Sequence, residues 1–83
     1  LASVFVVPDR RGAGIGSVLL PALVASAAQR GFHTMLAGID AANEASLRLH
    51  TRFGFRKVAQ FHEVGWKFDR WLDLVFLQRM LGA

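Results

Sequence analysis

A glycine-rich stretch, RRGAGIG at residues 10–16, separates a strand-like apolar run from a long helix-like apolar run. We expect a strand over residues 2–7, because Val and Phe favour a pleated surface and Pro8 stops a β-ladder. Residues 15–30 favour a helix that ends before Gly31, a residue suited to the left-handed position after a helix. The chain therefore has to begin with a strand–turn–helix unit, the first part of a βαβ arrangement.

The next segment supplies the second half of that arrangement. Residues 33–39 are typical of a strand, which should lie parallel to the first because a helix connects the two. Asn43 is a good N-cap for a helix that runs to Phe53, and Gly54 should end this helix.

The C-terminal third has the pattern of a β-hairpin. Residues 55–64 and 71–81 favour two long strands, and KFDR at 67–70 is the candidate turn between them. We therefore predict an α/β fold, strand–helix–strand–helix–strand–strand, with a mixed sheet that combines a parallel βαβ unit and an antiparallel hairpin. Residues 1–83 should form a single domain.

The helix over residues 15–30 carries apolar side chains nearly all round. Such a helix is buried or lies at an interface, so self-association through it is one expectation. The strand over residues 2–7 would present an apolar edge and is a second candidate for self-association, which makes a homo-oligomer such as a dimer the predicted state.

The composition excludes several classes of protein. Of the 83 residues, 53% are hydrophobic and none is cysteine, so the sequence predicts an ordered domain without disulfides or thiolate metal sites. No apolar run is long enough to cross a membrane and no signal-peptide pattern is visible, so we expect no membrane association and a cytoplasmic protein. The net charge of +4 suits an anionic ligand, but the basic residues form no block that would indicate nucleic-acid binding.

The glycine-rich turn, expected over residues 9–14, is a candidate anion site. Amides at a strand-to-helix turn form a concavity for phosphates, and Arg10 and Arg11 can add charge-assisted contacts. The alternative is a tight turn that binds nothing. A Walker A loop does not fit, because Gly16 is followed directly by Ser17, and the dinucleotide-binding fingerprint lacks its third glycine.

The second helix places three polar residues in a row on its inward face. Asn43, Ser46 and His50 are spaced i, i+3 and i+7. Each alone is explained by structure, as a cap, a serine bonded to its own backbone and a buried histidine with partners. Together they indicate a functional site, because buried polar groups need partners.

The segments PDRRGAGIG and NEASLRLHTRFGF together resemble the Gcn5-related N-acetyltransferase (GNAT) family. The first carries the Q/R-x-x-G-x-G/A signature and the second the N-x-x-S…G-F segment. The tail VGWKFDRWLDLVFLQRML, with histidine rather than tyrosine at position 50, is similar to the phosphinothricin and L-amino-acid N-acetyltransferase subfamily. The matching residues are Arg11, Gly14, Gly16, Asn43, Ser46, Gly54 and Phe55.

The resemblance implies transfer of an acetyl group from acetyl-CoA to the amine of a small molecule such as an amino acid or analogue, without a metal. It places His50 near the sulfur, where it would protonate the departing thiolate. It places Lys67 and Trp71 near the acceptor; packing within the hairpin is the alternative for Trp71. The implied acetyl-CoA contacts are Val4, Val6, Arg11, Gly12, Ala13, Gly14, Ile15, Gly16, Asn43 and Ser46.

The sequence departs from the family pattern in two ways. Only the C-terminal half of the family domain is present, so we expect a fragment or a protein without its first half. Leu1 stands where the subfamily usually has a glutamate base, and His62 and Glu63 are the possible substitutes. The alternative function is therefore a non-catalytic half domain that binds acyl-CoA or only self-associates.

Overall fold

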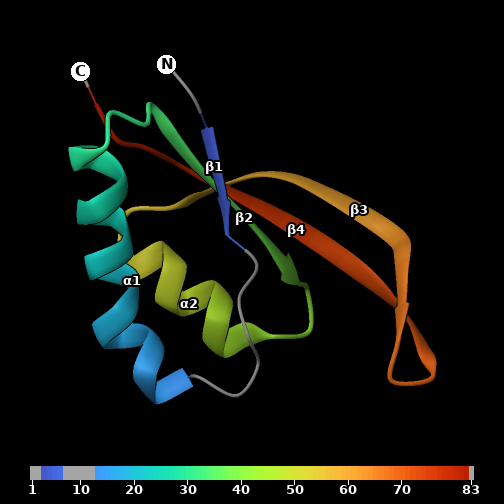
Figure 1. The fold of residues 1–83 in the computed structure, drawn as a ribbon. Helices are drawn as coiled ribbons and strands as arrows, with labels where there is room; N and C mark the ends of the chain where they lie inside the picture. The colour runs from blue at the N-terminus through green and yellow to red at the C-terminus, as the bar shows by residue number, and fades with distance from the viewer. Residues whose placement is uncertain (1–2, 7–12, 83) are drawn as a thin grey trace.

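The computed structural model describes residues 3–6 and 13–82, with side chains described for Ser3 and for residues 19–82. The order of its elements confirms the predicted α/β fold. These elements are β1 (Ser3–Val6), α1 (Ala13–Gln29), β2 (Thr34–Asp40), α2 (Glu44–Arg52), β3 (Arg56–Lys67) and β4 (Arg70–Met80) (Figure 1).

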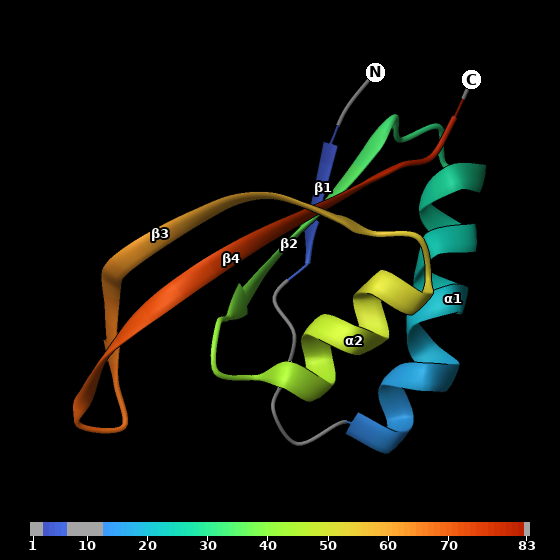
Figure 2. The same cartoon turned by 180° about the vertical axis from the view of Figure 1, so that it is seen from behind.

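The four strands form one sheet in the order β1-β2-β4-β3. β1 pairs parallel to β2, whereas β4 pairs antiparallel to both β2 and β3. Both helices lie on one side of this sheet, and the far end of the β3–β4 hairpin extends away from them (Figures 1 and 2). The hairpin end is thus free of helix packing.

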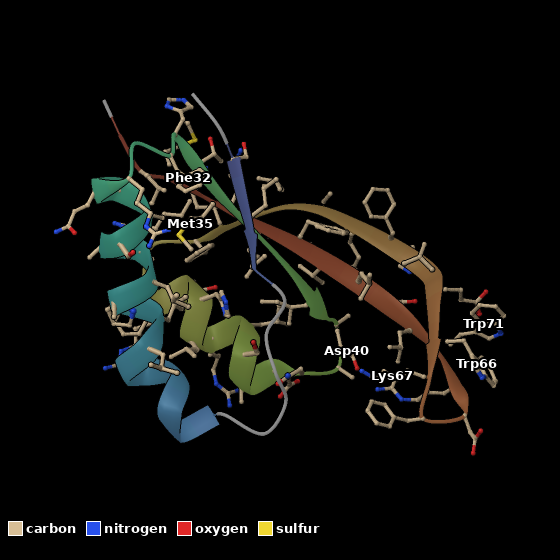
Figure 3. The ribbon with its side chains drawn as sticks, viewed as in Figure 1. Phe32, Met35, Asp40, Trp66, Lys67 and Trp71 are labelled. Atoms are coloured by element: carbon tan, nitrogen blue, oxygen red, sulfur yellow. The ribbon has the colours of Figure 1, made fainter. Side chains whose placement is uncertain are left out.

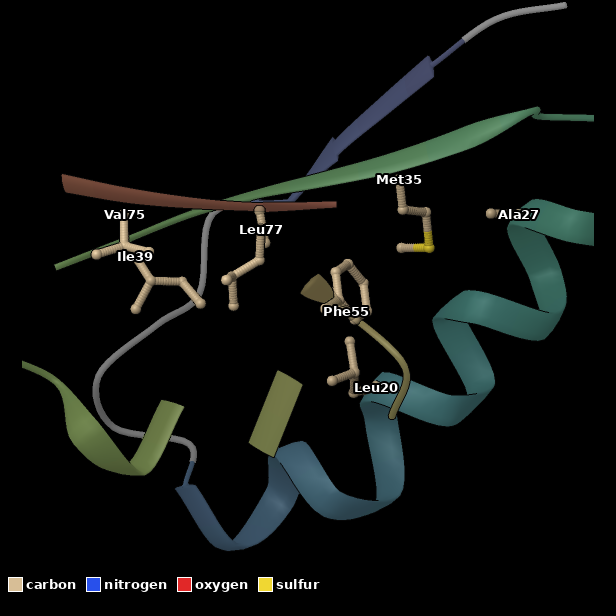
Figure 4. Close-up of a cluster of buried hydrophobic side chains, with 8 residues drawn as sticks. Leu20, Ala27, Met35, Ile39, Phe55, Val75 and Leu77 are labelled. Atoms are coloured by element: carbon tan, nitrogen blue, oxygen red, sulfur yellow. The ribbon is translucent and has the colours of Figure 1, made fainter. Parts of the chain in front are cut away.

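The core fills the space between the sheet and the helices (Figure 4). Alternate residues of β2 point into it, among them the fully buried Met35 and Ile39. Phe55, which follows α2, is buried to the same degree. In the register of the two strands, each inward residue of β2 lies opposite a residue of β4, for example Ile39 opposite Val75. Inward residues alternate because side chains along a strand point to opposite faces of the sheet in turn.

The apolar surface of α1 is only partly covered. Leu20, Val24 and Ala27 face the core, at the spacing of one helical stripe, whereas Leu19 and Leu23 are about half exposed. Among the described side chains, α1 therefore buries one face, and an interface on its other face stays a prediction.

Glycines end both helices as the sequence predicted. Gly31 and Gly54 have φ values of 83° and 91°, in the left-handed region that favours glycine. After α2, the N–H of Phe55 donates to the carbonyl of His50 and the N–H of Gly54 to that of Thr51. This paired bonding is the Schellman motif, and it turns Phe55 back into the core.

The hairpin turn is tighter than the four-residue KFDR turn that we expected. Phe68 and Asp69 are its two central residues, with φ of 55° and 56°, the left-handed conformation that a two-residue type I′ turn needs. The strands therefore reach Lys67 and Arg70, beyond the predicted limits. Glu63, with φ of 51°, lies in a bulge of β3.

Candidate functional site

The N-terminus of α1 presents backbone amides that have no acceptor within the helix. The helix starts at Ala13 rather than at residue 15, so Gly14, Ile15 and Gly16 belong to its first turn rather than to the preceding loop. The first four N–H groups of a helix have no acceptor within it, and this turn carries no acidic residue. The positive end of the helix dipole favours an anion at this position. The predicted contacts Arg11 and Gly12 lie outside the described residues.

β1 and β2 pair over only part of the length of β2. Val4 pairs with Met35 and Val6 with Ala37. Residues 38–40 of β2 pair with β4 on one side, but with no described residue on the side of β1. This is the side on which the resemblance expects an extended ligand, between the strands that include Val4 and Val6.

Asn43 begins α2 as the predicted N-cap. Its Oδ1 accepts the N–H of Ser46 at 3.1 Å, and its own N–H donates to the carbonyl of Asp40 at 2.9 Å. The first interaction satisfies one of the helix's orphan donors and leaves the side-chain amide donor of Asn43 without a partner among the described residues.

His50 is buried, with 3% of its surface exposed. Its Nδ1 lies 2.8 Å from the carbonyl oxygen of Ser46, which can only accept, so Nδ1 must carry the hydrogen. Nε2 of the neutral ring is then an acceptor, and it is buried without a hydrogen-bond partner among the described residues. The ring packs edge-on against Phe55, with centroids 5.1 Å apart.

Burial lowers the pKa of His50 from its ordinary value of 6.5, and the hydrogen bond to Ser46 offsets this only in part. The ring is therefore neutral at pH 7. The structure brings Asn43, Ser46 and His50 together in the predicted row. However, this geometry favours a proton acceptor at Nε2, whereas the resemblance had suggested a proton donor.

The predicted acceptor residues lie at the far end of the hairpin. The hairpin tip, residues 66–71, carries the rings of Trp66 and Trp71, whose centroids are 5.2 Å apart in an edge-to-face arrangement. Lys67 Nζ lies 5.4 Å from the ring of Phe68, and no described carboxylate pairs with it. In the parts of the chain that the structure describes, no hydrogen bond or ring contact joins this tip directly to His50.

A contact between Asp40 and Arg70 joins the tip to the end of β2. The sequence did not predict this contact. Arg70 Nη2 donates to Asp40 Oδ2 at 2.9 Å. Figure 3 shows Asp40 on the same side of the molecule as Lys67, Trp66 and Trp71. The two partners are 30 residues apart, so no local spacing signals their contact.

The substitute bases form a separate cluster at the bulge of β3. His62 Nδ1 lies 3.0 Å from Asp73 Oδ2, and the N–H of Glu63 donates to Asp73 Oδ1. These bonds, that of Glu63 first, lower the pKa of Asp73. His62 is largely exposed, and Leu1 lies outside the described residues. The cluster is thus a hydrogen-bonded group at the surface, which contributes little to stability.

Neither a metal centre nor a membrane-crossing helix is found among the described residues. Within residues 3–6 and 13–82, no three His, Asp or Glu side chains gather closely enough to hold a metal ion. The helices in these ranges are too short or too polar to cross a membrane.

Comparison with known proteins identifies the family. The sequence profile described as the Acetyltransferase (GNAT) family matches residues 1–55. The chain belongs to the GNAT family. It is 51% identical to the L-amino acid N-acyltransferase MnaT of Escherichia coli (strain K12), over 95% of this chain and 46% of that protein. It is 47% identical to a phosphinothricin N-acetyltransferase of Streptomyces coelicolor, over the same shares of the two chains.

A solved structure of this GNAT type has the same fold. It is yncA, a putative acetyltransferase from Salmonella typhimurium with its cofactor acetyl-CoA, which matches with a TM-score of 0.81 and 47% identity. The match covers 92% of this chain and 44% of that one. The chain thus spans about half the length of the GNAT relatives that it matches.

Proposed function

We propose that this chain carries the acetyl-CoA site of an N-acetyltransferase that acylates the amine of a small molecule, such as an amino acid or analogue. The observation that carries the proposal is His50, a buried neutral histidine whose Nε2 has no partner among the described residues. The activities of the similar L-amino acid and phosphinothricin acyltransferases support the substrate class.

The residues present fit acetyl-CoA. The open amides of residues 13–16 would bind its pyrophosphate, together with Arg11 and Gly12. The side of residues 38–40 that pairs with no described residue, and the backbone of β1, would bind the pantetheine arm, to which Asn43 would donate a hydrogen bond. Ser46 would line the same arm. Among the described residues, the side-chain amide donor of Asn43 and the edge of residues 38–40 away from β4 have no partner, whereas Ser46 already bonds Asn43 and His50.

When bound, acetyl-CoA supplies an acyl group activated as a thioester. The nucleophile must be a neutral amine, which loses a proton as it becomes an amide. As the C–N bond forms and the C–S bond breaks, His50 would accept the amine proton at Nε2 and pass it to the departing CoA thiolate, because burial disfavours the imidazolium. His50 thus supplies a base where the usual glutamate position is occupied by Leu1.

The hairpin tip would bind the acceptor. Lys67 has no described carboxylate partner, so its ammonium group suits the carboxylate of an amino acid. Trp71 offers an exposed aromatic surface beside it.

A non-catalytic half domain is the second candidate. Its support is Leu1 at the base position, together with apolar side chains of β3 that stay about half exposed, Val58, Phe61 and Val64. Exposed apolar surface of this kind favours self-association.

A homo-oligomer and a cytoplasmic location are further parts of the main proposal, drawn from the sequence.

Calorimetric titration with acetyl-CoA tests the main proposal. We expect micromolar binding that Gly14→Asp abolishes, because a carboxylate in the first turn of α1 repels the phosphates while favouring the helix itself. Gly82→Asp is the matched control, since a side chain there meets nothing within 4 Å.

Binding should be followed by an acceptor assay in which thiol release is measured over a panel of amino acids. Absence of binding by the unchanged protein, or equal binding by both aspartate variants, would contradict the proposed site. Sedimentation showing concentration-dependent association without binding would support the second candidate.

A further inference from the structure

The ion pair between Asp40 and Arg70 is the least exposed of those that the described residues form. The Asp40 side chain is 12% exposed and that of Arg70 42%. By contrast, the side chains of the Arg48–Glu44 pair on α2 are 75% and 80% exposed, and their charged atoms lie 3.8 Å apart. A pair that is short and shielded on one side holds its geometry better than an exposed one.

Asp40 also organises the loop that leads to Asn43. Its second carboxylate oxygen, Oδ1, accepts the N–H of Ala42 at 2.9 Å, and its backbone carbonyl accepts the N–H of Asn43. The intervening Ala41 donates to the carbonyl of Asp73 on β4. One carboxylate therefore holds the start of α2 through Oδ1 and the hairpin through Oδ2.

Arg70 stands at the base of the hairpin tip. It pairs with Lys67 across the two strands and precedes Trp71 in the sequence. The last register pair between β2 and β4 is Asp40 with Leu74, so the tip extends beyond the part of β4 that β2 supports. Figures 1 and 3 show this tip projecting past the end of β2. The position of the tip relative to the Asp40–Asn43 loop therefore depends on side-chain contacts such as the one that Arg70 makes.

We propose that Arg70 and Asp40 are positioning residues, which hold the hairpin tip in register with the Asp40–Asn43 loop so that a bound acceptor meets the acyl donor. The proposal rests on the proposed function, because it assigns the hairpin tip to the acceptor amine and the Asp40–Asn43 loop to acetyl-CoA. It predicts that loss of the pair weakens use of the acceptor and spares acetyl-CoA.

The kinetic test compares Arg70→Gln with Arg70→Lys. We expect Arg70→Gln to raise KM for the amino-acid acceptor by about threefold to tenfold, less than the loss of a direct charge-assisted hydrogen bond, because the partly exposed Arg70 acts only through the tip. KM for acetyl-CoA should change by less than about twofold. Arg70→Lys keeps the charge and should restore most of the acceptor KM. Arg48→Gln, which removes the same charge from the exposed pair on α2, should change neither value.

A second measurement does not depend on activity. The chain's only two tryptophans, Trp66 and Trp71, both lie in the hairpin tip, so tryptophan anisotropy reports the motion of this tip alone. Arg70→Gln should lower the anisotropy, Arg70→Lys should largely restore it, and Asp40→Asn should lower it as Arg70→Gln does. Because the pair acts as a unit, adding Asp40→Asn to Arg70→Gln should have little further effect.

The outcomes separate the two proposals. If the unchanged protein transfers no acetyl group but the anisotropy follows the pattern above, the proposed function fails. In that case the positioning of the hairpin tip by Arg70 and Asp40 is still supported. If the protein is active but Arg70→Gln changes both KM values equally, or neither, or leaves the anisotropy unchanged, the positioning role is wrong.

Discussion

Asn43 has two separable roles, one structural and one proposed, and substitutions can divide them. Its Oδ1 caps α2 through the N–H of Ser46, whereas its side-chain N–H group is the proposed donor to acetyl-CoA. Asn43→Ala removes both groups, whereas Asn43→Ser and Asn43→Asp keep a capping oxygen and remove the amide donor.

The magnitudes follow from the two hydrogen bonds. Loss of the cap in Asn43→Ala should lower the free energy of unfolding by about 1 kcal/mol, while Asn43→Ser should leave it nearly unchanged. Loss of a neutral hydrogen bond to the ligand costs about 0.5–1.5 kcal/mol, so all three variants should bind acetyl-CoA roughly twofold to tenfold more weakly. Asn43→Asp should be the weakest binder, because its charge opposes the phosphates.

Urea denaturation followed by far-UV circular dichroism gives the stability, and calorimetry gives the affinity. The reasoning is refuted if Asn43→Ser restores the affinity for acetyl-CoA together with the stability. In that case Asn43 serves only as a helix cap, and its amide group makes no contact with the ligand.

Two further predictions concern residues around the site. Because the pKa of His50 is lowered in the folded chain, the unfolded chain binds the extra proton first as the pH falls. The contribution of His50 to the free energy of unfolding is thus complete above pH 6.5 and is lost as the pH falls below it. His50→Gln should flatten this fall, measured as urea midpoints between pH 7.5 and 5. The same variant should lower turnover with little change in the affinity for acetyl-CoA. An unchanged slope would contradict the burial of a neutral ring. Gly54→Ala should cost more stability than Gly31→Ala: both strain a left-handed backbone by about 1–2 kcal/mol, but only the first new methyl group meets Arg79, whose Nε would be 3.3 Å away. Equal losses in thermal unfolding would show that Arg79 moves aside freely.

The sequence predicted the order of the elements because each has a strong local signal. Asn43 and Gly54 mark the ends of α2 through side-chain and backbone chemistry that acts within a few residues. The spacing of Asn43, Ser46 and His50 likewise placed them on one face, because helical geometry fixes that row.

The hairpin was predicted less well. Its turn residues, Phe68 and Asp69, adopt left-handed angles although neither is the glycine that signals such a turn. The pairing of long strands on both sides imposes this conformation, so the predicted strands were too short and the predicted turn too long.

What the sequence alone determined is the type and order of the elements and the family resemblance of its motifs. The tertiary structure decided which groups are left without partners and which distant groups meet. The carbonyl of Ser46 fixes the hydrogen on Nδ1 of His50, and burial against Phe55 keeps the ring neutral. The contact of Asp40 with Arg70 exists only because β4 lies beside β2. Local patterns describe neighbours along the chain, whereas protonation and long-range contacts depend on what the fold packs around each group.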